Sequence, residues 1–137
     1  MILTDTGPLV ALFDPADGSH THCKEILAKV TEPLCTTVPV LTEAFHLLSP
    51  ASIGARRLMD FVAARGLEVR YLDDRTLTRA FALMGRYADH PMDLADASLV
   101  VLAETLRFRK VFTIDRSDFA TYRIQQGHRQ LAFEILS

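Results

Sequence analysis

The stretch Met1-Ile-Leu-Thr-Asp5-Thr6-Gly7-Pro8 shows the pattern on which the whole chain is built. A short, mostly apolar run of the kind found in buried strands ends in an acid and turn-forming residues. Pro8 then favours a short helix from Leu9 to Phe13, because proline fits the first turn of a helix without losing a hydrogen bond. The stretch therefore predicts a strand that passes into a helix, with Asp5 at the carboxyl end of the strand.

Apolar strands and helical segments continue to alternate along the chain. Because a helix is the usual crossover between parallel strands, this order predicts an α/β fold, a three-layer α/β/α sandwich with a central parallel sheet of four to five strands. No long linker or repeat divides residues 1–137, so one domain is expected. The expected strands are 1–4, 34–37, 67–72, 110–114 and 131–135, and the expected helices are 9–13, 20–30, 39–48, 52–65, 74–87, 93–106 and 119–123.

The composition limits the classes of function. The 137 residues are 49% hydrophobic and include 15 basic and 17 acidic residues, with a formal net charge of −2. This charge argues against a protein that coats a polyanion, although a local basic surface stays open. Cys23 and Cys35 are too far apart for a C-x-x-C metal or redox pair, and no apolar run reaches the ~18 residues that span a bilayer. We expect reduced thiols in a soluble, cytoplasmic protein that does not associate with membranes.

Acidic residues recur at the ends of predicted strands and on apolar helices. Asp5 and Asp115 each follow an apolar strand, and both would emerge at one carboxyl edge if the first and fourth strands are neighbours. Glu43 lies near the helix face that should pack on the sheet, and Asp96 begins a helix that is apolar nearly all round. Each acid also has a structural interpretation, as a helix cap or as a partner of the helix dipole.

Two further acids have strong interpretations as helix caps. Asp93 and Asp96 have the i, i+3 spacing of a capping box, so Asp93 is expected as the cap and as a second candidate ligand. Asp118 is expected to cap the short helix 119–123.

Taken together, the acids suggest a divalent metal site. Acids gathered among apolar residues would repel one another unless shared cations held them. Oxygen ligands without a cysteine or histidine cluster select Mg²⁺ or Mn²⁺ over Zn²⁺. Such ions polarise a phosphoryl oxygen and generate hydroxide from bound water, which is the chemistry of phosphodiester hydrolysis.

Four motifs carry a resemblance to a known family. They are Asp5-Thr6 after the first strand, Glu43 on an early helix, Leu94-Ala-Asp96-Ala97 at the start of an apolar helix, and Thr113-Ile-Asp115 followed by Asp118-Phe119. In this order and spacing, over nearly the whole chain, they resemble the PIN-domain ribonucleases. Within that family, the length resembles the VapC-type toxins of bacterial toxin–antitoxin pairs.

The resemblance implies a metal-dependent endoribonuclease that acts on structured RNA such as tRNA or ribosomal RNA. It also implies a homodimer that a cognate antitoxin holds inactive. In this family the catalytic acids bind Mg²⁺ or Mn²⁺, with neighbouring residues in support. Carried over by position, the catalytic acids and metal ligands are Asp5, Glu43, Asp96 and Asp115, the further ligand is Asp93, and the residues that orient carboxylates or water are Thr6 and Thr113.

Two roles near the fourth strand stay open at this point. Many relatives have an asparagine at the position of Asp115 and the acid nearby, so Asp115 and Asp118 are alternative candidates for the fourth acid. Arg116 either contacts a scissile phosphate or pairs with a neighbouring acid.

Two other functions compete with the nuclease. In an aspartyl phosphotransfer domain Asp5 would be the nucleophile, but Asp5-Thr-Gly7 is not the Asp-x-Asp run of such phosphatases, and Lys110 lies at the wrong end of its strand. A non-catalytic module that binds RNA or a protein partner would be expected to lack one of the acids, and none is missing. Nucleotide-binding folds fail because neither G-x-x-x-x-G-K-[ST] nor G-x-G-x-x-G is present.

Some polar residues have no role assigned in any of these functions. Arg75, Arg79 and Arg86 would form one stripe on a helix, which fits contacts with RNA phosphates and equally fits a solvated helix face. No partner for His90 can be identified from the sequence.

Overall fold

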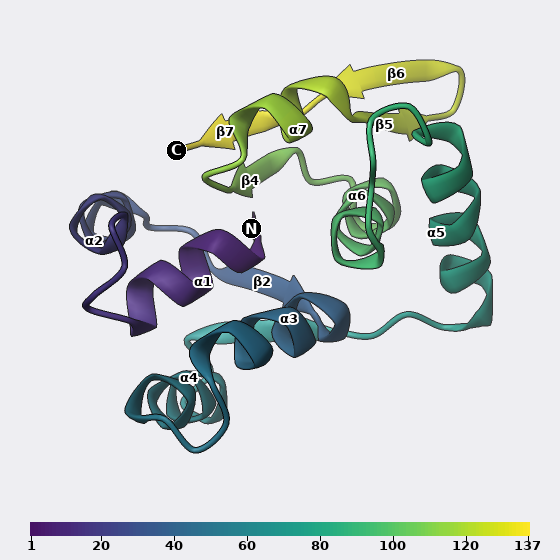
Figure 1. The fold of residues 1–137 in the computed structure, drawn as a ribbon. Helices are drawn as coiled ribbons and strands as arrows, with labels where there is room; N and C mark the ends of the chain where they lie inside the picture. Colours follow the sequence, from purple (N-terminus) through teal and green to yellow (C-terminus); the bar gives the residue numbers. More distant parts are fainter.

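The computed structural model describes residues 1–137 and places a parallel sheet between layers of helices (Figure 1). The sheet has five strands in the order β3-β2-β1-β4-β7, and each neighbouring pair is parallel. The strands are β1 (Ile2–Thr4), β2 (Leu34–Thr37), β3 (Leu67–Arg70), β4 (Lys110–Phe112) and β7 (Glu134–Leu136). The predicted α/β/α sandwich with a parallel sheet is confirmed.

Seven helices surround this sheet. They are α1 (Thr6–Phe13), α2 (His20–Lys29), α3 (Val38–Leu48), α4 (Ile53–Ala63), α5 (Asp74–Arg86), α6 (Leu94–Leu106) and α7 (Arg116–Thr121). Helices α1, α2 and α4 lie on one side of the sheet, whereas α6, with α5 outside it, lies on the other (Figure 1). Helix α3 contacts both α1 and α6, so it borders the space between the two helical layers. None of these helices combines the length and apolar character that crossing a membrane would require.

Helix α6 is the helix most enclosed by the protein. Residues Ala97–Ala103 are all buried, and the helix packs on β1, β2 and α5. Its N-terminal half is fixed to the end of β2, because the hydroxyls of Thr37 and Ser98 share a hydrogen bond of 2.6 Å. This packing holds the start of α6, with Asp93 and Asp96, beside the carboxyl ends of the strands.

Helix α1 begins at Thr6, three residues before the predicted start at Leu9. The cause is that Pro8 falls inside the first turn, where the backbone N–H groups have no partner within the helix and a missing N–H costs nothing. Asp5 keeps an extended backbone and immediately precedes the helix. The strand therefore passes into α1 without a loop, and Asp5 is fixed at the junction.

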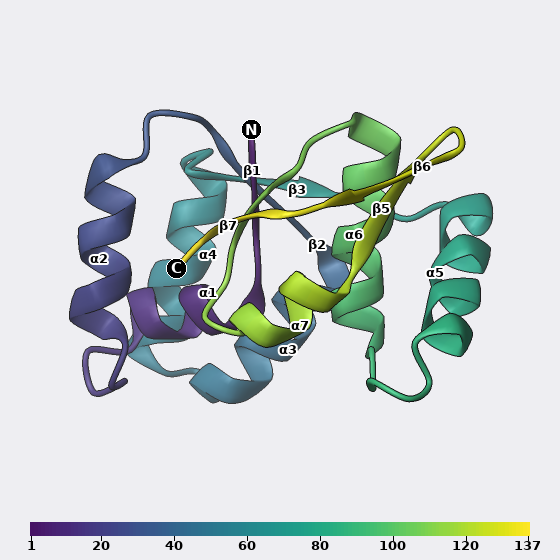
Figure 2. The same cartoon turned by 90° about the horizontal axis from the view of Figure 1, so that it is seen from above.

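The carboxyl-terminal part differs from the prediction. The single strand expected at 131–135 is replaced by a hairpin of β5 (Arg123–Gln126) and β6 (Arg129–Ala132), followed by β7. Gly127 has a φ of 61°, a left-handed conformation that glycine adopts without steric cost, and it forms the turn. The hairpin projects past α6 beyond the sheet (Figure 2), and β5 packs on that helix.

Candidate active site

Strands β1 and β4 are neighbours and end at the same edge of the sheet. Leu3 pairs with Val111, and Thr4 pairs with Phe112, so Asp5 and Thr113 follow at adjacent positions. The Thr113 hydroxyl donates a hydrogen bond to Asp5 Oδ2 at 2.8 Å. Its oxygen also accepts a hydrogen bond from the backbone N–H of Asp115 at 3.0 Å. The adjacency on which the sequence argument depended is confirmed.

Asp5 is the most deeply buried acid of this edge. It is 3% exposed, and this burial raises its pKa to about 6. The hydrogen bond from Thr113 acts in the opposite direction, while the charges of Asp115 and Glu43 raise the pKa further. Its ionised form therefore lies in a site that is already negative.

Asp96 lies in the first turn of α6 and its carboxylate points away from the helix cap. Asp93 Oδ1 accepts a hydrogen bond from the backbone N–H of Asp96 at 2.8 Å, which confirms Asp93 as the cap. The Asp96 carboxylate does not complete a capping box; Oδ2 accepts a hydrogen bond from the Tyr122 hydroxyl at 3.1 Å. Burial raises the pKa of Asp96 to about 8, and the charges of Asp93 and Asp5 add to the effect.

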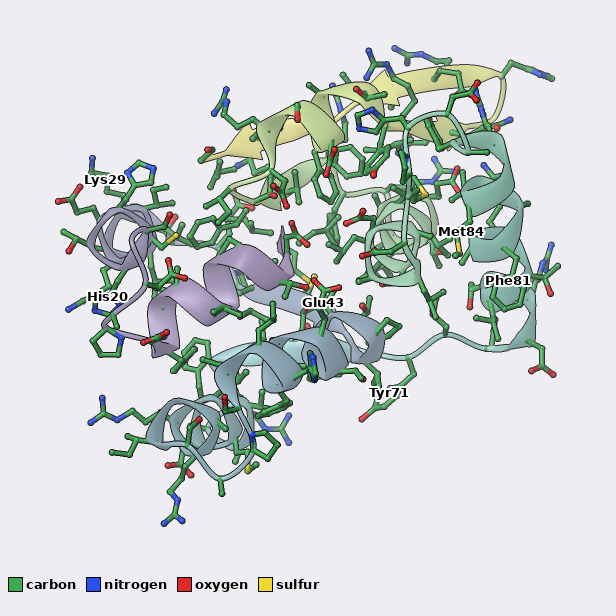
Figure 3. The ribbon with its side chains drawn as sticks, in the orientation of Figure 1. His20, Lys29, Glu43, Tyr71, Phe81 and Met84 are labelled. Atoms are coloured by element: carbon green, nitrogen blue, oxygen red, sulfur yellow. The ribbon has the colours of Figure 1, made fainter.

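Glu43 approaches the same edge from α3. Figure 3 shows its side chain directed from α3 into the space between α1 and α6. Partial burial raises the Glu43 pKa, and the neighbouring Asp93 raises it further, whereas the Thr6 hydroxyl lowers it. Thr6 Oγ1 is itself buried and makes no hydrogen bond of ordinary geometry. The prediction that Glu43 lies on the side of α3 that faces the fold therefore agrees with the structure.

Asp115 and Asp118 differ in their surroundings. Asp115 precedes α7, its carboxylate makes no capping bond, and burial together with the charge of Asp118 raises its pKa. Asp118 lies inside the first turn of α7, and its Oδ1 is 2.7 Å from Nε2 of His90. The prediction that Asp118 caps a helix 119–123 is wrong, because the helix begins at Arg116 and Asp118 bonds across to His90. Arg116 is exposed and forms no ion pair.

The structure brings all the predicted acids to one edge of the sheet. Asp5, Glu43, Asp96 and Asp115 all have raised pKa values, and in each case the charge of another of these acids or of Asp93 contributes. No lysine or arginine forms an ion pair with any of them. The edge thus concentrates negative charge that no basic side chain balances.

The donor set suits a hard divalent cation, because it consists of carboxylate and hydroxyl oxygens. As the side chains lie, however, no three of these groups are close enough together to hold a metal ion. Cation binding would therefore require carboxylates to rotate toward a common point. Glu43 is partly exposed and Asp115 is exposed, and neither carboxylate is held by a hydrogen bond of ordinary geometry, so both are free to rotate.

Three aromatic or imidazole side chains of the site had no role assigned from the sequence. Tyr122 is completely buried and reaches Asp96, His90 pairs with Asp118, and the Tyr87 ring packs edge-on against Tyr122 at 5.2 Å. Tyr122 and Asp96 are 26 residues apart, so no local spacing links them. The one available signal was the phenol itself, because a buried tyrosine hydroxyl needs a hydrogen-bond partner.

Two arginines of the stripe on α5 contact other parts of the fold. Arg79 donates from Nε and Nη2 to the two carboxylate oxygens of Glu104, at 2.9 and 3.0 Å. Arg86 lies over the Tyr87 ring at 5.7 Å. These partners within the protein account for Arg79 and Arg86 without contacts to RNA.

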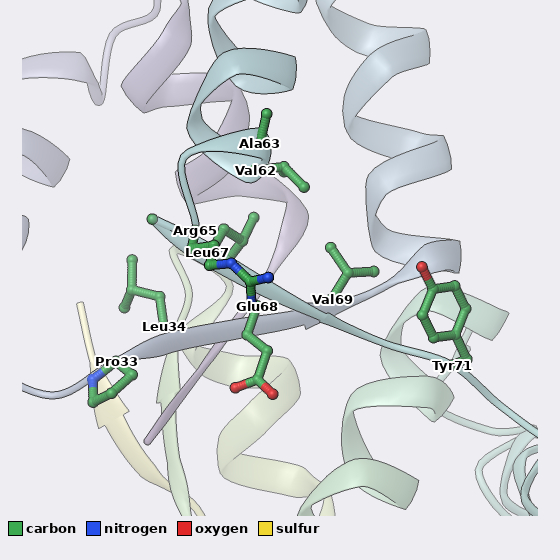
Figure 4. A pocket seen from close by; sticks show the side chains of 10 residues that line it. Pro33, Leu34, Val62, Ala63, Arg65, Leu67, Glu68, Val69 and Tyr71 are labelled. Atoms are coloured by element: carbon green, nitrogen blue, oxygen red, sulfur yellow. The ribbon is translucent and has the colours of Figure 1, made fainter.

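The largest pocket of the molecule is far from the acids in the fold. It has a volume of about 720 Å³ and lies beside β3, at the outer edge of the sheet (Figure 4). Pro33, Leu34 and Leu67 line it at the amino ends of β2 and β3, opposite to the carboxyl ends where Asp5 lies. Glu68 is its one acidic residue. This pocket lacks the acids needed for the chemistry predicted from the sequence.

Comparison with known proteins finds one relative in sequence and two solved structures of similar fold. No family model matches the chain. Ribonuclease VapC26 of Mycobacterium tuberculosis is 27% identical over 130 residues, which cover 93% of this chain and 96% of the relative. In fold, the chain is similar to the crystal structure of Mycobacterium tuberculosis VapC20, a toxin that cleaves the sarcin–ricin loop. That match has a TM-score of 0.77 and 20% identity over 86% of this chain and 94% of VapC20.

A second solved structure agrees with the first. A toxin–antitoxin complex from Klebsiella pneumoniae matches with a TM-score of 0.67 and 20% identity, over 88% of this chain and 92% of the matched one. At this identity both structural matches establish the fold. The resemblance of the sequence to the VapC-type PIN-domain ribonucleases is therefore confirmed, by a relative in sequence over nearly the whole chain and by the shared fold.

Proposed function

We propose that this protein is an endoribonuclease that depends on Mg²⁺ or Mn²⁺ and that its catalytic acids are Asp5, Glu43, Asp96 and Asp115. The observation that carries the proposal is the convergence of these acids at the carboxyl ends of β1 and β4 without a balancing lysine or arginine. Burial, and after it the charges of neighbouring acids, raises the pKa values of Asp5 and Asp96, and a bound cation would stabilise their ionised forms. The relationship to Ribonuclease VapC26 supports RNA as the substrate.

The side chains have separable tasks in this proposal. A bound divalent cation would polarise a phosphoryl oxygen and lower the pKa of a bound water. Asp5 and Asp96 would hold it from the sheet edge and from α6, with Glu43, Asp115 and Asp93 around it. Thr113 orients Asp5 through the hydrogen bond to Oδ2.

Other neighbours of the acids would support substrate binding. Arg116 is exposed next to Asp115 and is free to contact a phosphate of the RNA. Asp118 lies nearby but is engaged by His90, so we assign it a supporting role. Thr6, whose hydroxyl has no partner, is placed to orient Glu43 or a water molecule.

We also propose that the protein is the toxin of a type II toxin–antitoxin pair, acts on structured RNA such as tRNA or ribosomal RNA and forms a homodimer. The match to VapC20, which cleaves the sarcin–ricin loop, supports a structured ribosomal target. The match to a toxin–antitoxin complex supports a cognate antitoxin as partner.

The competing functions have less support. An aspartyl phosphotransfer site would need a basic side chain near Asp5. Lys110 instead pairs with Glu32 at the amino end of β4, whereas Asp5 lies at the carboxyl ends of the strands. A non-catalytic binding module would not need the full set of acids, and the whole set converges here. The nuclease accounts for both observations.

Cleavage of total bacterial RNA tests the proposal. The purified protein would be incubated with Mn²⁺, Mg²⁺ or EDTA, beside Asp96→Asn and the control Asp60→Asn, whose exposed acid on α4 makes no hydrogen bond or ion pair. We expect discrete fragments with either metal, none with EDTA or Asp96→Asn, and the wild-type pattern from Asp60→Asn. Intact RNA under every condition from folded protein would overturn the proposal, and equal cleavage by Asp96→Asn would remove the proposed site.

A further inference from the structure

We propose that Tyr122 is a positioning residue of the active site: its hydroxyl holds the Asp96 carboxylate in the orientation in which Asp96 binds the cation. This inference rests on the proposed function of the acids. It assigns a role to a side chain outside the carboxylate set, at the end of a different helix.

The first observation is the single polar contact that the Tyr122 hydroxyl makes at ordinary hydrogen-bond length. The residue is 0% exposed, so its phenol cannot turn to water. Its hydroxyl is 3.1 Å from Asp96 Oδ2, whereas the nearest alternative acceptor, the carbonyl oxygen of Pro91, is at 3.5 Å. A buried hydroxyl needs such a partner, and here the partner is a proposed metal ligand.

The second observation is that the phenol ring is fixed from several sides. The rings of Phe119, Tyr87 and His90 pack edge-on against it, with centroid distances of 5.3, 5.2 and 5.9 Å. These neighbours come from α7, from the residue after α5 and from the loop before α6. The position of the hydroxyl is therefore set by α7 and by the connection between α5 and α6, and the ring is fully enclosed.

The third observation concerns the end of α7. The Arg123 guanidinium donates to the carbonyl oxygens of Ala120 at 2.6 Å and Tyr122 at 2.9 Å, and the Arg123 backbone N–H donates to the Tyr87 hydroxyl at 3.0 Å. These bonds hold the backbone of Tyr122 where the helix ends. Both the ring and the backbone that carry the hydroxyl are thus restrained.

Asp96 gains a defined orientation from this contact. The charges of Asp93 and Asp5 act on the Asp96 carboxylate, and without a donor this repulsion would turn it away from Asp5. The Tyr122 hydroxyl occupies Oδ2 and leaves Oδ1, which makes no hydrogen bond within the protein, for a cation. A donor that fixes one oxygen of a ligating carboxylate improves metal binding because the ligand is oriented beforehand.

The alternative is that Tyr122 is only a packing residue. Tyr122→Phe separates the two roles, since it keeps the ring and its edge contacts and removes the hydroxyl. Tyr71→Phe is the matched control, since it removes the same hydroxyl from an exposed tyrosine after β3 that makes no hydrogen bond within the protein.

The measurement is Mn²⁺ binding by titration calorimetry, joined to kcat and KM for RNA cleavage and to thermal unfolding in EDTA. For Tyr122→Phe we expect an Mn²⁺ Kd raised by about tenfold or more, a matching fall in kcat and little change in KM. For Tyr71→Phe we expect the wild-type Kd and the wild-type Tm. Wild-type Mn²⁺ affinity in Tyr122→Phe would overturn the positioning role.

The design separates this inference from the proposed function. If the wild type binds Mn²⁺ but cleaves no RNA, the proposed function fails and the two Kd values still decide the role of Tyr122. If the wild type does not bind Mn²⁺, both the cation site and the positioning role are overturned.

Discussion

The Thr113 hydroxyl donates to Asp5 Oδ2 at 2.8 Å and thereby joins the carboxyl ends of β4 and β1 at the proposed active site. Asp5 can be buried there because this donor partly offsets the cost of removing its carboxylate from water. The same hydroxyl oxygen accepts from the Asp115 backbone, so one threonine organises two of the acids.

Replacement of Thr113 tests this organisation. Thr113→Val keeps the shape of the side chain but leaves Asp5 Oδ2 and the Asp115 N–H without their partner, so we expect a loss of about 1 to 3 kcal/mol in unfolding free energy. We also expect kcat/KM for RNA to fall about tenfold or more. Thr113→Ser, which retains the hydroxyl, should keep most of both quantities; urea unfolding and initial cleavage rates would measure them. Wild-type cleavage by Thr113→Val would show that the bond does not orient Asp5.

The stability of the metal-free protein should depend on pH. The pKa values of Asp5 and Asp96 are raised to about 6 and about 8, from an ordinary value of 3.8. Between the ordinary pKa of 3.8 and the raised pKa of each acid, the folded protein binds more protons than the unfolded chain. The unfolding free energy therefore falls as the pH rises through this window. In EDTA we expect Tm to fall by about 5 °C or more from pH 5 to pH 8.

Two comparisons check the origin of that pH dependence. Asp96→Asn removes one of the titrating groups and should flatten the Tm profile, and saturating Mn²⁺ should raise Tm most at pH 8, where the acids are ionised. A Tm in EDTA that rises over this range would contradict the raised pKa values.

Asp115 and Asp118 can be separated as candidates for the fourth acid. Asp115 is free of capping bonds, whereas Asp118 is held by His90 at 2.7 Å. We therefore expect Asp115→Asn to lower the RNA cleavage rate at least about tenfold more than Asp118→Asn does. Single-turnover cleavage at saturating Mn²⁺ would measure both. The reverse order would assign the fourth acid to Asp118.

Arg79 should contribute to stability and not to RNA binding. Its guanidinium is bonded to both oxygens of Glu104, which is 13% exposed and also accepts from the Gln125 backbone. Arg79→Met leaves the Glu104 carboxylate without its charged partner. We therefore expect the unfolding free energy to fall by about 1 to 3 kcal/mol and the KM for RNA to stay unchanged. Arg75→Met, on the exposed side of the same helix, is the control for stability. A raised KM for RNA in Arg79→Met would show instead that Arg79 contributes to RNA binding.

Much of the architecture followed from local signals in the sequence. The apolar strands before Asp5 and Asp115, the cap at Asp93 and the enclosed helix α6 have short-range patterns that translate directly into structure. The carboxyl-terminal hairpin could not be predicted in this way, because β5 and β6 are short and polar and lack the apolar pattern of a strand. Its formation depends on packing of β5 against α6, a contact between distant parts of the chain.

The site was predictable to a similar extent. An aspartate or glutamate is a candidate metal ligand by its residue type, so Asp5, Glu43 and Asp96 could be named from the sequence pattern alone. Tyr122 and His90 could not, because each acts through a partner more than 25 positions away, Asp96 and Asp118 respectively. Asp118 was interpreted as a cap because its tertiary partner was invisible in the sequence.

The most direct test of the central claim is the rate of RNA cleavage as a function of Mn²⁺ concentration, measured for the wild type and for Asp5→Asn. The account predicts a rate that rises from zero in EDTA to a plateau for the wild type, and a plateau at least about 100-fold lower for Asp5→Asn. A wild-type rate that does not depend on Mn²⁺, or an equal plateau for the folded variant, would contradict the claim that these acids form a metal-dependent nuclease site.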